Sequence, residues 1–124
     1  MEKMLIIDSR LGQFMKDRLR DLYPKSFGKL ELKTLDDEIE ENEKFEFFFI
    51  SARELCENEK TEALIRKLGR KRAVIFACSS EALYAEQVLK ENKAHHAFIK
   101  EKLLLFHNPD YETKIKNAIH YYSN

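Results

Sequence analysis

The chain has 124 residues, of which 44% are hydrophobic and 35% are charged. This composition provides enough apolar material for one core and argues against a disordered chain. Lysine plus arginine and aspartate plus glutamate both number 22, which excludes the overall basic excess of most proteins that bind nucleic acid or anionic membranes. No apolar run reaches the length of a signal sequence or a membrane span, so we expect one cytoplasmic domain over residues 1–124.

Short apolar runs of strand length alternate with helical patterns, beginning with a strand at Met4–Ile7. A helix follows, in which apolar residues recur at helical spacing and which Tyr23-Pro24 ends. The apolar residues of this helix, which we expect to face a sheet, are Leu11, Phe14, Met15, Leu19 and Leu22.

The next two strand-like runs differ in pattern. Leu30–Leu35 includes alternating apolar and charged residues, which predicts an edge strand with one partly wet face. Phe45–Ile50 is almost continuously apolar, which predicts a central strand buried on both faces. Between them we expect a short, exposed acidic helix near Asp36–Asn42. We do not expect this segment to bind calcium, because it lacks the spacing and the turn glycine of a calcium loop.

The second half of the chain continues the alternation. Its expected elements are a helix at Glu59–Leu68, a central strand at Ala73–Ala77, a helix at Glu81–Lys90 capped by Ser79 or Ser80, a strand at Ala97–Ile99, and a last helix that Asn108 caps and Pro109 opens. Strands that alternate with helices in this way predict an α/β fold, a three-layer αβα sandwich around a parallel sheet.

In an open parallel sheet, ligands bind outside the carboxyl ends of the strands, where the strand order reverses. The residues that follow the predicted strands are therefore the candidate site. They are Asp8, Ser9, Ser51, Cys78, Ser79 and Lys100.

These strand ends resemble those of response regulator receiver domains. Leu5-Ile6-Ile7-Asp8-Ser9 looks like the first strand and its acidic pair, and Phe48-Phe49-Ile50-Ser51 looks like the third strand, which in the family ends in the phosphorylated aspartate. Ile75–Ser79 looks like the fourth strand, which ends in Ser or Thr, and Ala97–Lys100 like the fifth, which ends in lysine. The resemblance spans nearly the whole chain and implies a flavodoxin-like fold with a five-stranded sheet of order 2-1-3-4-5.

The departures from the family pattern decide the expected function. Receiver chemistry uses an acceptor aspartate and two further carboxylates that hold Mg²⁺, a cation that prefers oxygen ligands. Here Ser51 and Ser9 stand in two of these places, which leaves Asp8 as the only carboxylate of the three. A serine hydroxyl is a poor nucleophile without a nearby base. We therefore expect no metal, no cofactor and no catalysis, but an atypical receiver that acts by phosphorylation-independent protein contact.

Two further positions depart from the pattern. Glu101 replaces the proline that usually follows the lysine, and Ala97 stands where the family often has an aromatic switch residue. We expect Asp8, Ser51 and Lys100 to form an internal hydrogen-bonded or ion-paired cluster. The alternative is that Asp8 and Ser51 only cap the loops after their strands and that Lys100 is a surface lysine.

The resemblance also implies a docking surface. Receivers commonly dimerise or bind partners through their fourth helix, fifth strand and fifth helix, which makes the interface candidates Tyr84, Phe106, Tyr111 and Tyr122. Aromatic residues favour interfaces, but they favour cores too. The apolar loop at 102–107 either folds back onto the core or meets a partner.

Other features have less specific interpretations. The basic cluster at 66–72 is typical of a solvated helix end, and it lacks the interleaved aromatic residues of a nucleic-acid site. Cys56 and Cys78 are expected to be reduced and buried. An alternative for the whole chain is a flavodoxin-like domain that binds a nucleotide or a small anion, although the loop Ser9–Gly12 is poor in the glycine and hydroxyl residues of a flavin phosphate loop.

Overall fold

The computed structural model describes residues 2–68, 74–76, 82–91, 98–99 and 107–122. Its parallel strands form one sheet of order β2-β1-β3-β4-β5, made of β1 (Lys3–Ile7), β2 (Glu31–Thr34), β3 (Phe47–Ile50), β4 (Val74–Phe76) and β5 (Phe98–Ile99). The helices of the described part are α1 (Gly12–Leu22), α2 (Pro24–Phe27), α3 (Ala52–Glu57), α4 (Glu59–Leu68), α5 (Ala82–Glu91) and α6 (Pro109–Tyr122).

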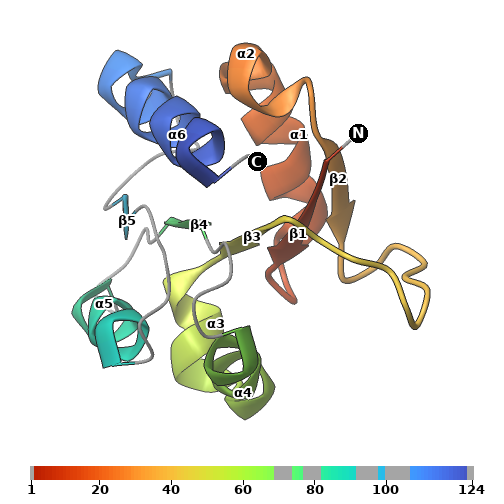
Figure 1. Ribbon diagram of the computed structural model, residues 1–124, viewed down its shortest axis with the longest axis vertical. Coiled ribbons are helices and arrows are strands. Elements are labelled where there is room, and N and C mark those ends of the chain that lie inside the picture. Colours follow the sequence, from red (N-terminus) through yellow and green to blue (C-terminus); the bar gives the residue numbers. More distant parts are fainter. Residues whose placement is uncertain (1, 69–73, 77–81, 92–97, 100–106, 123–124) are drawn as a thin grey trace.

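The helices lie on both faces of the sheet. Helices α1, α2 and α6 cover one face, and α3, α4 and α5 cover the other (Figure 1). The predicted α/β fold, a parallel sheet between helical layers, is therefore confirmed. No helix within the described ranges is both long enough and apolar enough to cross a membrane.

The main core lies between the sheet and the layer of α1, α2 and α6. Side chains alternate along a strand, so every second residue of β1 and β3 faces this layer, and Ile6 is paired with Phe49 in the register of these two strands. The core cluster consists of Met4, Ile6, Met15, Leu19, Tyr23, Phe27, Leu30, Leu32, Phe47, Phe49 and Ile115. This packing holds β1 and β3 side by side, and the carboxyl ends of these strands carry the candidate site.

Helix α1 is rotated relative to the expected orientation. Met15 and Leu19 are buried, but Leu11 is 46% and Phe14 50% exposed, so the prediction that the whole apolar stripe faces the sheet is wrong for these two residues. Gly12 is buried instead, and a Cβ atom added there would lie 3.4 Å from the Cβ of Thr34. The close approach of α1 to β2 therefore sets the rotation of the helix.

Strand β2 is an edge strand, as predicted, but no helix follows it. Leu32 and Thr34 are buried, whereas Glu31 and Lys33 are only partly covered. The expected acidic helix at Asp36–Asn42 is wrong, because residues 35–46 form turns and irregular backbone. Closely spaced carboxylates repel one another on a helix, and β2 offers no apolar side chain on its second face for such a helix to cover.

The connection between β2 and β3 is instead ordered by its own polar contacts. The Lys33 ammonium donates to the backbone oxygen of Glu38 at 3.1 Å and to the carboxylate of Glu43 at 2.8 Å. Lys3 also pairs with Glu43, at 3.4 Å. The Lys33 contact lowers the pKa of Glu43 below its ordinary value, since its favourable effect on the charged carboxylate exceeds that of desolvation.

Two short helices escaped the sequence analysis. Pro24 does end α1, but it also opens α2, because proline suits the first position of a helix. Helix α3 directly follows Ser51 and is only six residues long, too short for a hydrophobic period to stand out. The predicted helix at Glu59–Leu68 is confirmed.

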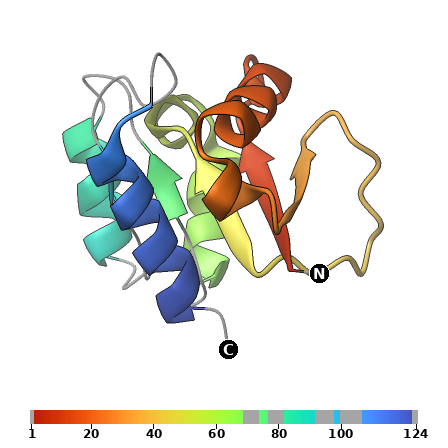
Figure 2. The same cartoon turned by 90° about the horizontal axis from the view of Figure 1, so that it is seen from above.

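The start of α6 is also as predicted. The Asn108 side chain accepts a hydrogen bond from the backbone N–H of Asp110 at 2.9 Å, as a helix cap does. The backbone N–H of Asn108 donates to the hydroxyl of Tyr23 at 3.3 Å. Tyr23 therefore joins the end of α1 to the start of α6, which lie on the same face of the sheet (Figure 2).

Several predictions fall outside the described residues. Among the candidate site residues these are Cys78, Ser79, Lys100 and Phe106, and the same holds for most of the apolar loop at 102–107 and of the basic cluster at 66–72.

Candidate functional site

Asp8 and Ser51 lie next to each other at the carboxyl ends of two neighbouring strands. Ile7 pairs with Ile50 in the register of β1 and β3, so the residues that follow them are neighbours. The backbone N–H of Ser51 donates to the oxygen of Ile7 at 3.4 Å. The structure therefore brings together three residues of the candidate site, Asp8, Ser9 and Ser51.

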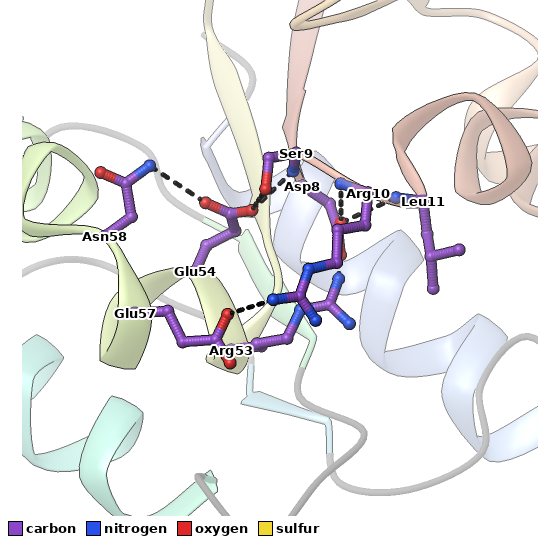
Figure 3. Close-up of polar contacts among 8 residues, drawn as sticks. All are labelled: Asp8, Ser9, Arg10, Leu11, Arg53, Glu54, Glu57 and Asn58. Atoms are coloured by element: carbon purple, nitrogen blue, oxygen red, sulfur yellow. Dashed lines mark hydrogen bonds and ion pairs between the residues drawn. The ribbon is translucent and has the colours of Figure 1, made fainter.

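The carboxylate of Asp8 is surrounded by hydrogen-bond donors. Its side chain is 2% exposed, and its Oδ1 atom accepts the backbone N–H groups of Arg10 and Leu11, both at 2.9 Å. The same oxygen accepts a guanidinium N–H of Arg53 at 2.7 Å. Asp8 thus caps the loop that leads into α1 and also forms an ion pair with the first turn of α3, as Figure 3 shows.

These donors keep the Asp8 carboxyl ionised. Burial by itself raises the pKa of this group, because desolvation penalises the charged form. The N–H groups of Leu11 and Arg10, the hydroxyl of Ser51 and the charge of Arg53 together outweigh burial, so the pKa of Asp8 lies below its ordinary value. The site therefore contains a buried negative charge that the protein itself compensates.

Ser9 is held by a second buried carboxylate, that of Glu54. Glu54 is 3% exposed, and its Oε1 atom accepts both the backbone N–H of Ser9 at 2.5 Å and the Ser9 hydroxyl at 2.6 Å. Its other oxygen accepts the side-chain amide of Asn58 at 3.3 Å. The crevice therefore contains a second buried carboxylate, which lies outside the three family positions that the sequence analysis compared.

A third contact continues this arrangement. The guanidinium of Arg10 pairs with Glu57 at 3.1 Å on the surface. Three consecutive residues of the loop after β1 thus contact three residues of α3, in the pairs Asp8 with Arg53, Ser9 with Glu54 and Arg10 with Glu57 (Figure 3). We call these three contacts the loop–α3 clamp.

Sequence reasoning missed the α3 side of this clamp. Arg53, Glu54 and Glu57 lie in a helix that was not predicted, so they were not considered as neighbours of Asp8. One signal was available, because Glu54 stands three residues after Ser51, where an acidic residue favours the first turn of a helix. Had Ser51 been treated as the residue before a helix, Arg53 and Glu54 would have been placed beside the crevice.

The hydroxyl of Ser51 is buried but weakly engaged. Its oxygen has no hydrogen-bond partner of good geometry among the described residues, and it does not cap α3. It lies near enough to Asp8 to help lower the pKa of that carboxyl. Asp8 is already committed to three donors, so it is poorly placed to remove the proton of Ser51.

The described residues do not fit a magnesium ion. No group of three acidic, histidine or cysteine side chains among them could hold a metal. Asp8 faces a guanidinium, and Glu54 is occupied by Ser9 and Asn58. A hard divalent cation would need these oxygens as ligands, and here a protein cation already lies against one of the two carboxylates.

The interface candidates fall into different environments. Tyr84, on α5, is 44% exposed, next to Leu83 at 71%. Tyr111, on α6, is partly buried and packs against the core cluster. Tyr122 ends α6, but its side chain, like Phe106, lies outside the description. Among the four candidates, Tyr84 is the one whose exposure is described.

No protein-family model and no curated protein sequence matches the chain. Solved structures do match its fold. A response regulator receiver domain protein from Clostridium thermocellum aligns at a TM-score of 0.63 and 16% identity, over 98% of this chain and 96% of the other. A CheY-like response regulator from Mesorhizobium loti aligns at a TM-score of 0.58 and 10% identity, over 98% of both chains. A protein described as adenylate cyclase from Rhodopirellula baltica aligns at 0.62 and 14%, over 98% and 89%. The chain therefore has the fold of CheY-like response regulator receiver domains.

Proposed function

We propose that this chain is an atypical receiver domain, or pseudo-receiver, of a two-component-type signalling system. It has a five-stranded sheet with the strand order of receivers. It acts in the cytoplasm by phosphorylation-independent contact with a protein. The observation that carries the proposal is the ion pair between Asp8 and Arg53 at 2.7 Å. The carboxylate that would help to bind a metal in a receiver is neutralised from within the chain.

The residues of the crevice support a site without phosphoryl transfer. Transfer to a receiver needs a nucleophilic carboxylate and a divalent cation that neutralises the incoming phosphoryl group. At the acceptor position this chain has Ser51, and the carboxylate beside its hydroxyl, that of Asp8, is already held by Arg53 and two backbone N–H groups. We infer that the domain holds one conformation without modification.

The partner surface that we propose is formed by α5, β5 and α6, with homodimerisation as one form of contact. Leu83 and Tyr84 are exposed on α5, and tyrosine is enriched in interfaces and among the residues that contribute most to binding. Tyr84 is the first residue to test on this surface.

Mass spectrometry tests the absence of phosphoryl transfer. After incubation with acetyl phosphate and Mg²⁺, the intact mass should remain unchanged, since Ser51 stands at the acceptor position and the described residues offer no set of three metal ligands. A stable gain of one phosphate would contradict the proposal. A cofactor that copurifies with the protein would favour the flavodoxin-like, ligand-binding alternative.

Substitution on α5 tests the partner surface. Y84A should weaken association, measured as self-association by sedimentation or as recovery of a partner on immobilised protein, by about tenfold or more if Tyr84 is central to the interface. The matched control is Q87A, because Gln87 is exposed on the same helix and bonds only to Glu91 in the described part of the chain. Equal loss in both variants, or in neither, would argue against this surface.

A further inference from the structure

We infer that the guanidinium of Arg53 is a built-in replacement for the divalent cation of a receiver-like crevice, and that Arg53 is the residue that keeps such a cation out. This inference rests on the proposed function and deepens it, because it assigns the exclusion of the divalent cation to one residue of the crevice.

The first support is the charge balance of the loop–α3 clamp. Its ionisable groups are three carboxylates, on Asp8, Glu54 and Glu57, and two guanidinium groups, on Arg10 and Arg53. Glu57 and Arg10 pair with each other near the surface. This leaves two buried carboxylates and one cation, Arg53, in the inner part of the crevice. Buried carboxylates need a positive partner to remain ionised.

The second support is the coordination of Asp8. Its Oδ1 atom accepts two backbone N–H groups and one guanidinium N–H. A metal ion would have to displace Arg53 from this oxygen, because both compete for the same negative charge. Arg53 and Asp8 are only 2.7 Å apart, and the Asp8 side chain is almost fully buried. Both features favour the guanidinium, which forms strong charge-assisted hydrogen bonds with carboxylates and is only weakly hydrated.

The third support is the way Arg53 is positioned. Arg53 stands between Ala52 and Glu54 in the first turn of α3, and Glu54 is held by Ser9 while Glu57 is held by Arg10. The other two pairs of the clamp thus fix α3 against the loop after β1. The Arg53 side chain is 26% exposed at this position. The fold therefore holds the Arg53 guanidinium beside Asp8, unlike the mobile charge of an exposed surface arginine.

Removal of Arg53 should leave the Asp8 carboxylate without its cation, next to the segment that holds the buried carboxylate of Glu54. Two buried carboxylates on neighbouring segments attract a hard cation. We therefore expect the variant R53A to acquire affinity for a divalent cation that the parent chain lacks.

Manganese is the probe of choice, because the free ion can be counted by its electron paramagnetic resonance signal. Four full-length proteins are titrated with Mn²⁺: the parent chain, R53A, D8N/R53A and R20A. R53A should bind Mn²⁺ more tightly than the parent chain, on the order of tenfold or more, the scale set by losing one charged hydrogen-bond partner. D8N/R53A should return to the level of the parent chain, and R20A, which removes an exposed cation of α1 outside the clamp, should stay there.

Thermal unfolding provides a second measurement. R53A should unfold at a lower temperature than the parent chain and regain part of the loss when Mn²⁺ is added, whereas the parent chain should not respond. Tight Mn²⁺ binding by the parent chain would overturn the inference. The inference would also fail if D8N/R53A bound Mn²⁺ as tightly as R53A does. It would fail as well if R53A stayed unfolded at every Mn²⁺ concentration. None of these results depends on Tyr84, so this inference and the proposed partner surface can fail separately.

Discussion

Asp8 is a buried carboxylate whose charge is stabilised by its neighbours. Its pKa is lowered although burial opposes this, because two backbone N–H groups, the Ser51 hydroxyl and Arg53 favour the ionised form. An unfolded aspartate titrates near pH 3.9, and the folded Asp8 titrates lower. The stability that Asp8 supplies is therefore complete above about pH 4 to 5 and is lost as the pH falls through the folded pKa.

The variant D8N tests this pH dependence. At neutral pH it should lower the free energy of unfolding by about 2 kcal/mol, the scale of hydrogen bonds to a charged group. Because asparagine does not titrate, the loss of stability between about pH 4 and pH 2 should be shallower than in the parent chain. Urea unfolding across this range measures both effects. The matched control is D21N, at an exposed aspartate, and equal effects of the two variants would contradict the assignment to Asp8.

At this scale the sequence placed only half of the site. Asp8 and Ser51 follow apolar runs, so their meeting at neighbouring strand ends follows from the parallel sheet alone. Arg53 and Glu54 act through α3, a helix without a visible hydrophobic period. Their role depends on which face of a short helix turns toward the loop after β1, and only tertiary packing decides that. Lys100, the third member of the expected cluster, remains a prediction.

The elements are joined by a few specific contacts, and Tyr23 is the clearest example. Its side chain is fully buried between the end of α1 and the start of α6. Its hydroxyl accepts the Asn108 N–H, and its ring lies 5.4 Å from that of His107, which itself bonds to Glu112 at 2.6 Å. Two of the helices that cover one face of the sheet, α1 and α6, are thus linked across 85 residues of sequence.

The variant Y23F separates the hydroxyl from the ring. The loss of one partly buried hydrogen bond should cost about 1 kcal/mol, which corresponds to a fall of roughly 4 °C in the melting temperature. Y23A, which also removes the ring from the core, should cost about 3–5 kcal/mol. Thermal unfolding measured by circular dichroism tests this ranking. Identical losses in the two variants would mean that the ring does not matter.

The success of prediction at the element scale followed the strength of the hydrophobic pattern. The helix at Glu59–Leu68, the cap at Asn108 and the edge position of β2 were all expected and are found. The acidic helix after β2 was not found, because side-chain pairs with Lys33 and Lys3 order that connection in another way. Such pairs join distant residues and leave no periodic trace in the sequence.

Among the described residues, one core cluster joins the first half of the chain to the last helix. The core cluster draws on β1, β2, β3, α1, α2 and α6, so these elements should lose their structure together. The parallel α/β fold was predictable from composition and from the alternation of strand-like and helix-like runs. The orientation of α1 was not, because it depends on the close contact of Gly12 with Thr34.

The variant L19A tests this cooperativity. Leu19 is fully buried on α1, so truncation should lower the free energy of unfolding by about 2–5 kcal/mol. Circular dichroism, which follows the helices, and tyrosine fluorescence, which includes Tyr23, should report the same midpoint in both the parent chain and the variant. Two separate midpoints would show that the layers unfold independently.

The connection between β2 and β3 is also a suitable place to insert a tag. Glu43 ties this connection to β2 through Lys33 and to β1 through Lys3, while Glu40, Glu41 and Asn42 are exposed. Extra residues inserted at its tip would lengthen a loop whose ends are already tied, and each doubling of loop length costs only about 0.6 kcal/mol. A short epitope or a dye-labelling tag between Glu41 and Asn42 would therefore report on the protein in living cells and leave both α5 and the crevice untouched.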